Sequence, residues 1–228
     1  MRRLLPLLAL LPLASVAAPN SQMKLVWSDE FNAPEIDATK WNVHNSVTIK
    51  DGKANLNLTP GKEPGIWGSS TLNSARKFTQ VNGYFEASVR MLQTKGRSGR
   101  FEVRNTSLDE PPSARLIFEG WGDDNVLPSA QVADNTGLRM LRPIKHGIDF
   151  DGGASYKKFH TYGVHWTPKF FEWYVDGKKV HRLERATPTA PMFVEFCHHT
   201  AEGGKVKEFP DPANGPEPLQ IDWVKVWK

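Results

Sequence analysis

Cysteine is almost absent from this chain, which limits how its fold can be held together. Cys197 is the single cysteine among 228 residues, so no intramolecular disulfide can form. The fold must rest on core packing and on any bound metal. Long helical patterns are also scarce, because few extended windows keep a helical period and 17 prolines interrupt most of them.

Long apolar runs are absent except near the start of the chain. Residues 4–13 contain only leucine, alanine and proline; they follow Met1-Arg2-Arg3 and precede small residues up to Ala18. A membrane-spanning helix needs roughly 20 apolar residues, whereas a basic, then apolar, then small pattern is typical of a secretory signal. We therefore predict that residues 1–18 are a cleaved signal peptide and that the product is secreted or periplasmic, with no membrane span.

Neither sign of charge dominates the mature chain. The formal charge of +4 includes Arg2 and Arg3, and without them 27 basic residues face 25 acidic ones, a net charge of +2. Arg97, Arg100 and Arg104 form a local positive cluster, but no nucleic-acid-binding motif accompanies it. We predict no nucleic-acid partner and expect a monomer.

Short segments of strand-like composition recur along the whole mature chain. Residues 84–90 alternate between polar and apolar side chains, as expected for a sheet with one solvent-exposed face and one buried face. This pattern predicts an all-β antiparallel sandwich of two stacked sheets, in a single domain at residues 19–228. The expected strands lie at residues 24–27, 54–58, 83–91, 114–118, 160–166, 170–175 and 219–227.

A tight hairpin is predicted at Asp176-Gly177. This dipeptide readily adopts the positive φ angles that a two-residue turn requires. Residues 170–174 should therefore pair with residues 179–183.

Five motifs follow one another in a fixed order. They are Leu25-Val26-Trp27-Ser28-Asp29-Glu30-Phe31, Gly83-Tyr84-Phe85-Glu86-Ala87, Phe159-His160-Thr161-Tyr162-Gly163-Val164-His165-Trp166, Glu172-Trp173-Tyr174-Val175-Asp176-Gly177 and Ile221-Asp222-Trp223-Val224. This order, which spans nearly the whole mature chain, resembles glycoside hydrolase family 16, the laminarinase and lichenase type. The resemblance implies a concanavalin-like jelly roll whose concave sheet forms a groove for a polysaccharide. We expect Trp27, Trp166 and Trp223 to fill the core.

The resemblance also implies where catalytic carboxylates should lie. Family members place them on one strand as Glu-x-Asp-x-Glu or, with a bulge, Glu-x-Asp-x-x-Glu, and retaining hydrolysis needs both outer carboxyl groups. Glu119 matches the acid/base position. The nucleophile position falls on Ala114 with the bulge or on Arg115 without it, and the central Asp on Leu116 or Ile117. Neither register supplies a nucleophile, so we predict a catalytically impaired scaffold.

Charged residues replace the Trp-rich strand that the family uses to stack sugars. Residues 99–105 occupy that place and carry Arg100, Glu102 and Arg104. Guanidinium groups bind carboxylates and sulfates in a bidentate manner, so this segment favours an acidic polysaccharide.

A second polar strand is predicted at residues 193–200. Alternation places Glu195, Cys197 and His199 on one face, which we expect to look toward Glu119. Three interpretations remain open. We favour a polar glycan-binding surface; the others are a metal site of Cys197, His199 and a carboxylate, and an inverting pair of Glu119 with Glu195 or Glu102, for which the carboxyl groups should lie roughly 6.5 to 9.5 Å apart.

Three further residues complete the candidate site. Trp67 and Trp121 lie in predicted loops, where each could stack on a sugar ring or cap the core. Asp222 matches the aspartate that helps many family members bind a structural calcium ion, although one side-chain ligand is little evidence for such a cation. No cofactor is required.

Three functions are compatible with these residues. The leading hypothesis is a non-hydrolytic polysaccharide-binding protein. The alternative is a divergent endo-glycosidase with Glu119 as general acid/base and a relocated second carboxylate. The third, an interaction module without glycan binding, is ranked last because the predicted groove is polar.

Overall fold

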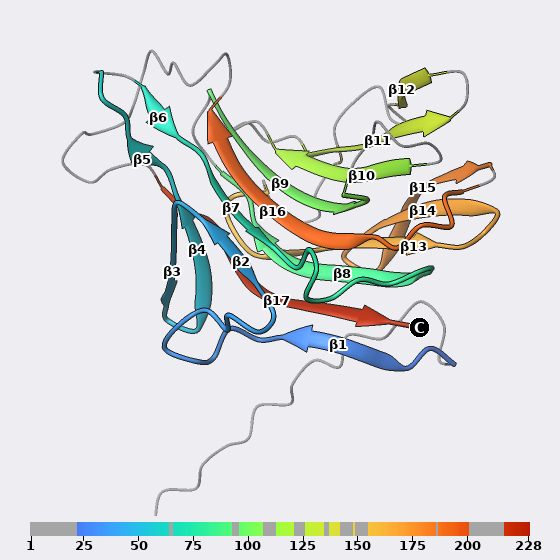
Figure 1. Ribbon diagram of the computed structural model, residues 1–228, viewed down its shortest axis with the longest axis horizontal. Coiled ribbons are helices and arrows are strands. Elements are labelled where there is room, and N and C mark those ends of the chain that lie inside the picture. Colours follow the sequence, from blue (N-terminus) through green and yellow to red (C-terminus); the bar gives the residue numbers. More distant parts are fainter. Residues whose placement is uncertain are drawn as a thin grey trace, which may run out of the picture.

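The computed structural model forms a two-layer β-sandwich (Figure 1). It describes residues 22–63, 66–92, 96–106, 113–120, 126–134, 137–141, 148, 155–185, 187–200 and 217–228. These segments contain strands and no helix, and every pair of strands is antiparallel, as the sequence predicts. Accordingly, they include no helix long and apolar enough to cross a bilayer. The predicted signal peptide at residues 1–18 lies outside this part of the chain.

The larger layer is an eight-stranded sheet with the order β15-β14-β13-β8-β17-β4-β3, in which β1 also pairs with β17. β4 pairs with the beginning of β17 and β1 with its end, so β17 joins both strands to the sheet. The bounds are β1 Leu25–Asp29, β3 Ser46–Lys50, β4 Lys53–Asn57, β8 Gly83–Arg90, β13 His160–Trp166, β14 Phe170–Val175, β15 Lys178–Glu184 and β17 Leu219–Trp227.

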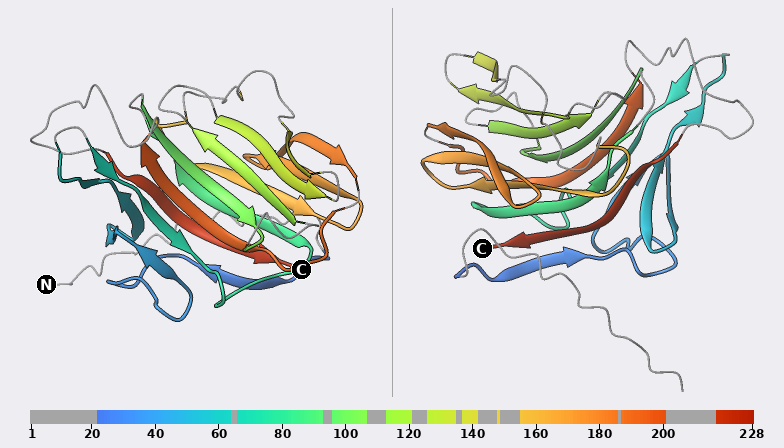
Figure 2. Two further views of the ribbon diagram at one scale, coloured as in Figure 1. Left: turned by 45° about the horizontal axis from the view of Figure 1, so that its top comes forward. Right: turned by 180° about the vertical axis from the view of Figure 1, so that it is seen from behind.

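The second layer is a seven-stranded sheet with the order β12-β11-β10-β9-β16-β7-β2. Both sheets are curved, and this sheet lies on the inside of the bend (Figures 1 and 2). Its strands are β2 Asn42–His44, β7 Ser70–Asn73, β9 Arg97–Arg104, β10 Ser113–Gly120, β11 Val126–Asp134, β12 Gly137–Leu141 and β16 Phe193–Thr200. A separate two-stranded sheet consists of β5 Thr59–Pro60 and β6 Trp67–Gly68.

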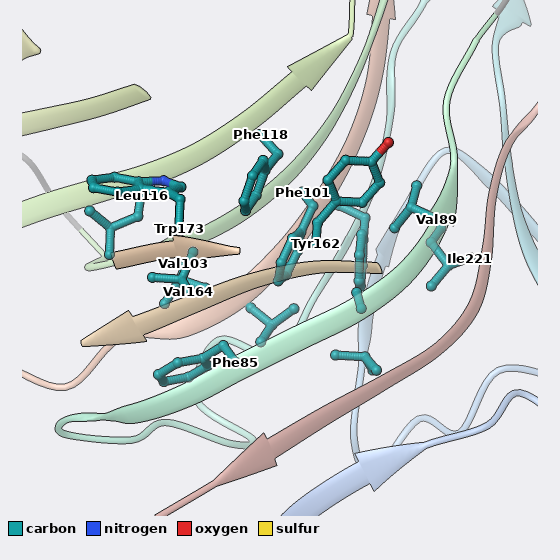
Figure 3. Packing of buried hydrophobic residues seen from close by; sticks show 14 of the residues in the cluster. Phe85, Val89, Phe101, Val103, Leu116, Phe118, Tyr162, Val164, Trp173 and Ile221 are labelled. Carbon is teal, nitrogen blue, oxygen red and sulfur yellow. The ribbon is translucent and has the colours of Figure 1, made fainter. Parts of the chain in front are cut away.

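The core lies between the two large sheets and is rich in aromatic rings (Figure 3). Phe101 and Phe118 stack with their ring centroids 6.2 Å apart, and Phe118 contacts Tyr162 of the opposite sheet at 5.2 Å. All three side chains are fully buried. Burial of each such ring contributes on the order of 2 kcal/mol or more, so packing can stabilise this fold without a disulfide.

The first motif is held together by Asp29. One carboxylate oxygen accepts a hydrogen bond from the Phe31 backbone N–H at 2.9 Å, and the other accepts one from Trp41 Nε1 at 2.8 Å. Phe31 adopts a φ of 51°, which turns the chain so that both rings enter the core. Asp29 therefore joins Phe31 and Trp41 into one structural unit.

The predicted hairpin is confirmed. Asp176 and Gly177 have φ angles of 48° and 74°, and they connect β14 to β15 with Tyr174 opposite Lys179. The Asp176 carboxylate also accepts one hydrogen bond from the Thr161 backbone N–H at 3.0 Å and contacts His160 Nδ1 at 2.7 Å. The turn is thereby attached to β13.

One core assignment is wrong. Trp166 is fully buried and Trp27 is partly buried against the core, but Trp223 lies outside it. A register shift between Ile221 and Trp223 in β17 breaks the alternation, so Trp223 shares the outer face with Lys225, whose Nζ lies 4.6 Å from the indole centroid. The bulge was not visible in the sequence.

Candidate functional site

The register of β10 decides between the two sequence alignments. β10 pairs with β9 and β11 without a bulge, so Arg115, Ile117 and Glu119 share one face. Ala114 and Leu116 point into the core and are fully buried. The residue four positions before Glu119 on the same face is therefore Arg115, whereas Ala114 lies on the core face.

The side chains that point away from the core on β9, β10 and β16 form what we call the polar face. These strands are adjacent, with β9 in the middle (Figure 1). Alternation brings together residues that are far apart in the sequence, as predicted. The main members of the polar face are Ser98, Arg100, Glu102, Arg104, Arg115, Ile117, Glu119, Glu195, Cys197 and His199.

Glu119 is held by donors from the neighbouring strand. Its Oε1 accepts a hydrogen bond from Ser98 Oγ at 2.7 Å and a short charge-assisted one from Arg100 Nε. His199 Nε2 lies 3.9 Å from the same oxygen. The Glu119 side chain keeps 15% of its surface exposed, so it can still meet a ligand.

Arg115 forms a bidentate contact with Glu102. Its Nε and Nη2 donate to the two carboxylate oxygens at 2.5 and 2.6 Å, and its Nη1 donates to Gln131 at 3.5 Å. The Glu102 side chain is fully buried, and burial raises the pKa of this carboxyl against the opposing effect of Arg115. Burial would lower the pKa of Arg115, but the bonds to Glu102 raise it above the usual range. The pair therefore places a charged guanidinium on the face of β10 that also carries Glu119.

Guanidinium groups also separate the carboxylates that could form an inverting pair. Arg104 Nη1 lies 3.0 Å from Glu195 Oε1 and 3.9 Å from Glu102, while Arg100 contacts both Glu119 and Glu102. An inverting pair needs room for a water molecule between its carboxyl groups. This geometry gives no support to a pair of Glu119 with Glu102, and it places Glu195 two strands from Glu119.

Cys197 and His199 lie side by side, with Sγ 3.7 Å from Nδ1. Burial and the charge of Glu102 raise the pKa of the Cys197 thiol to about 11, whereas burial together with Arg100 and Arg115 lowers the pKa of His199 to about 4. Both side chains are therefore uncharged near neutral pH. No group of three or more His, Cys, Asp or Glu side chains within the described segments could hold a metal ion, so the proposed metal site gains no support.

Arg97 does not belong to the positive cluster predicted from the sequence. It lies three residues before Arg100 on the same strand, so the two side chains point to opposite faces. Arg97 is fully buried on the core side. The positive charge of the polar face therefore comes from Arg100, Arg104 and Arg115.

The remaining predicted residues lie away from these contacts or outside the described segments. Trp67 lies in β6, which is close to β16, and is partly buried; Trp121 falls among the undescribed residues 121–125. Asp222 is 38% exposed and its Oδ1 lies 3.8 Å from Lys53 Nζ. Because a lysine ammonium already faces this carboxylate, the structure adds no support for a calcium ion at Asp222. The calcium ion stays a prediction.

Sequence reasoning missed three polar neighbours of the predicted residues. Ser98 donates to Glu119, Gln131 accepts from Arg115, and Thr71 Oγ1 lies 3.9 Å from Cys197 Sγ. Ser98 could have been found, because it alternates with Arg100 and Glu102 along β9. Thr71 and Gln131 depend on strand pairing, for which the sequence gives no local signal.

Comparisons with known proteins agree with this architecture. The laminarinase catalytic domain of Thermotoga petrophila superposes with a TM-score of 0.72 at 18% identity and covers 90% of this chain and 98% of that domain, a likeness that supports the fold. The beta-glucanase of Acetivibrio thermocellus is 29% identical over 187 residues, covering 80% of this chain. This chain spans about half of that relative, 52% of its length.

Two further matches identify the family. The model of glycosyl hydrolases family 16 matches residues 140–225. The beta-glucanase of Paenibacillus polymyxa is 34% identical over 204 residues, which cover 87% of this chain and 80% of that protein. The fold, these two matches and the ordered motifs lead to one conclusion: the chain belongs to glycosyl hydrolases family 16.

Proposed function

We propose that this chain is an exported protein that binds a polysaccharide on its polar face and lacks efficient hydrolysis. Family membership and the beta-glucanase relatives support a glycoside hydrolase or polysaccharide-binding function. Glu119, Arg100, Arg104, Glu195 and His199 remain partly exposed on the polar face, with donors and acceptors that suit sugar hydroxyl groups.

The observation that carries the proposal is the guanidinium at position 115. Double displacement needs a carboxylate that attacks the anomeric carbon, and a guanidinium has no lone pair available for that attack. Arg115 binds the Glu102 carboxylate through Nε and Nη2. This contact also keeps the Glu102 carboxylate from acting as the nucleophile. The contact of Arg115 with Glu102 therefore supports a protein that binds its ligand without covalent catalysis.

A divergent endo-glycosidase is the second candidate. Glu119 and Glu195 are both partly exposed carboxylates on the polar face, and the family relatives are named as glucanases. In this case Glu119 would protonate the leaving oxygen and a second carboxylate would activate water. Oε2 of Glu119 would have to carry that proton, because Oε1 already accepts hydrogen bonds from Ser98 and Arg100.

One experiment separates the two candidates. The mature chain, residues 19–228, is incubated with neutral and acidic polysaccharides while new reducing ends and bound polymer are followed in the same samples. Glu119→Gln is tested beside it, with Glu172→Gln on the other sheet as the matched control. We expect binding without release of reducing ends in all three proteins.

Two results would change this assignment. Reducing ends that appear with the wild type and Glu172→Gln but not with Glu119→Gln would establish a hydrolase. Neither binding nor release would instead favour an interaction module. Export is tested separately, by sequencing the amino terminus of the secreted product, which we expect near residue 19.

A further inference from the structure

Glu102 occupies an unusual place at the centre of the polar face. It lies on β9, the middle of the three strands, and its side chain has no exposed surface. Three arginines surround its carboxylate: Arg115 at 2.5 Å, and Arg100 and Arg104 each at 3.9 Å. One buried carboxylate thus contacts every arginine of the polar face.

The charges of the polar face sum to zero. Arg100, Arg104 and Arg115 face Glu102, Glu119 and Glu195. Each arginine makes its closest contact with a different glutamate: Arg100 with Glu119, Arg104 with Glu195 and Arg115 with Glu102. Cys197 and His199 add no charge near neutral pH, because their pKa values lie at about 11 and about 4. The acidic ligand expected from the arginines alone would have to compete with carboxylates that already bind them.

We propose that Glu102 is a positioning residue that makes the polar face selective for uncharged polysaccharides. This inference rests on the proposed binding function. Glu102 accepts hydrogen bonds from Nε and Nη2 of Arg115. It also lies 3.9 Å from Arg100 and from Arg104, which in turn bind Glu119 and Glu195. The ligand therefore meets carboxylate and guanidinium groups in fixed alternation, and sugar hydroxyls can donate to the first and accept from the second.

Loss of the Glu102 charge should reverse this selectivity. Glu102→Gln keeps the shape of the side chain but leaves the polar face with one excess positive charge, close to Arg115. A partly buried charge is poorly screened, so an anionic polymer should then gain affinity at low salt. Arg115→Gln should shift selectivity in the opposite direction, and the double variant should return to the wild-type preference.

The test uses one polymer backbone in two charge states. Binding of a neutral β-glucan and of its carboxymethylated derivative is measured at low salt and at about 0.5 M salt. We expect the wild type to prefer the neutral polymer at both salt concentrations. Glu102→Gln should bind the carboxymethylated polymer at least about fivefold more tightly than the wild type does at low salt, and this gain should vanish at high salt.

Glu172→Gln provides the matched control. Glu172 is nearly buried, and it contacts Arg182 at 2.7 Å and Lys179 at 3.0 Å, but it lies on the eight-stranded sheet. It should lose stability without any change in charge selectivity. If Glu102→Gln does not fold, the opposite shift expected for Arg115→Gln still tests the inference.

The outcomes separate this inference from the proposed function. Preference of the wild type for the carboxymethylated polymer, or equal selectivity in Glu102→Gln, Arg115→Gln and Glu172→Gln, would overturn the role of Glu102 while leaving polysaccharide binding intact. Failure of the wild type to bind either polymer would overturn the proposed function itself.

Discussion

Arg115 on β10 and Glu102 on β9 form a bidentate ion pair within the polar face, with donor–acceptor distances of 2.5 and 2.6 Å. Removal of one partner leaves the other buried and only partly compensated. We expect Arg115→Met to lower the free energy of unfolding by about 3 kcal/mol. Urea denaturation of the single variants and of Arg115→Met/Glu102→Leu measures this coupling.

The double variant should be less destabilised than the sum of the single variants, because an apolar pair needs no charge compensation. Additive losses would show that the two side chains act independently, contrary to the geometry described.

Stability should depend on pH through Glu86. Burial raises the pKa of this carboxyl from 4.5 to about 7, and its Oε2 has no hydrogen-bond partner, while Tyr84 donates to Oε1 at 2.7 Å. The folded state then binds more protons than the unfolded state between these two values, so stability falls as pH rises from about 4.5 to 7. The loss should amount to about 3 kcal/mol.

Glu86→Gln removes this titration and keeps an acceptor for Tyr84. Its unfolding free energy, measured in urea across pH 4 to 8, should therefore show a flatter profile than that of the wild type. Parallel profiles for the two proteins would contradict the assignment to Glu86.

Cys197 should react slowly with thiol reagents. Burial and the charge of Glu102 raise the thiol pKa to about 11, so the reactive thiolate is a fraction on the order of 0.001 at pH 8. Because the chain has one cysteine, a single kinetic phase reports on it. Alkylation should accelerate strongly in urea; equal rates in the folded and unfolded protein would count against this burial.

Gly163 should not tolerate a side chain. A Cβ atom there would overlap the hydroxyl and ring carbons of Tyr84, which is almost fully buried. We expect Gly163→Ala to cost about 2 to 3 kcal/mol, measured by thermal or urea unfolding. Tyr84→Phe should not rescue it, because the ring carbons remain, whereas Tyr84→Ala in the same chain should relieve part of the loss.

Strand positions were predictable because alternation and turn residues are local signals. The expected segments at residues 160–166 and 170–175 coincide with β13 and β14, and the Asp176-Gly177 turn has the predicted form. The bulge in β17 was not predictable, because it depends on pairing with β8. Trp223 was assigned to the core for that reason.

The candidate site was predictable in its membership more than in its contacts. Alternation correctly placed Glu195, Cys197 and His199 on the same face as Glu119. The sequence could not choose between Ala114 and Arg115, since the presence of a bulge is a property of the folded sheet. It also could not show that the arginines are bound by glutamates, because such pairs join strands distant in sequence.

The ion pair of Arg115 with Glu102 also constrains how this protein can evolve. A single substitution that placed a carboxylate at position 115 would remove the bidentate partner of Glu102 and bring two acidic groups against each other in a buried setting. The destabilised intermediate would be selected against before any gain in chemistry could appear. An acidic residue at this position therefore requires coordinated changes on two strands, at positions 115 and 102.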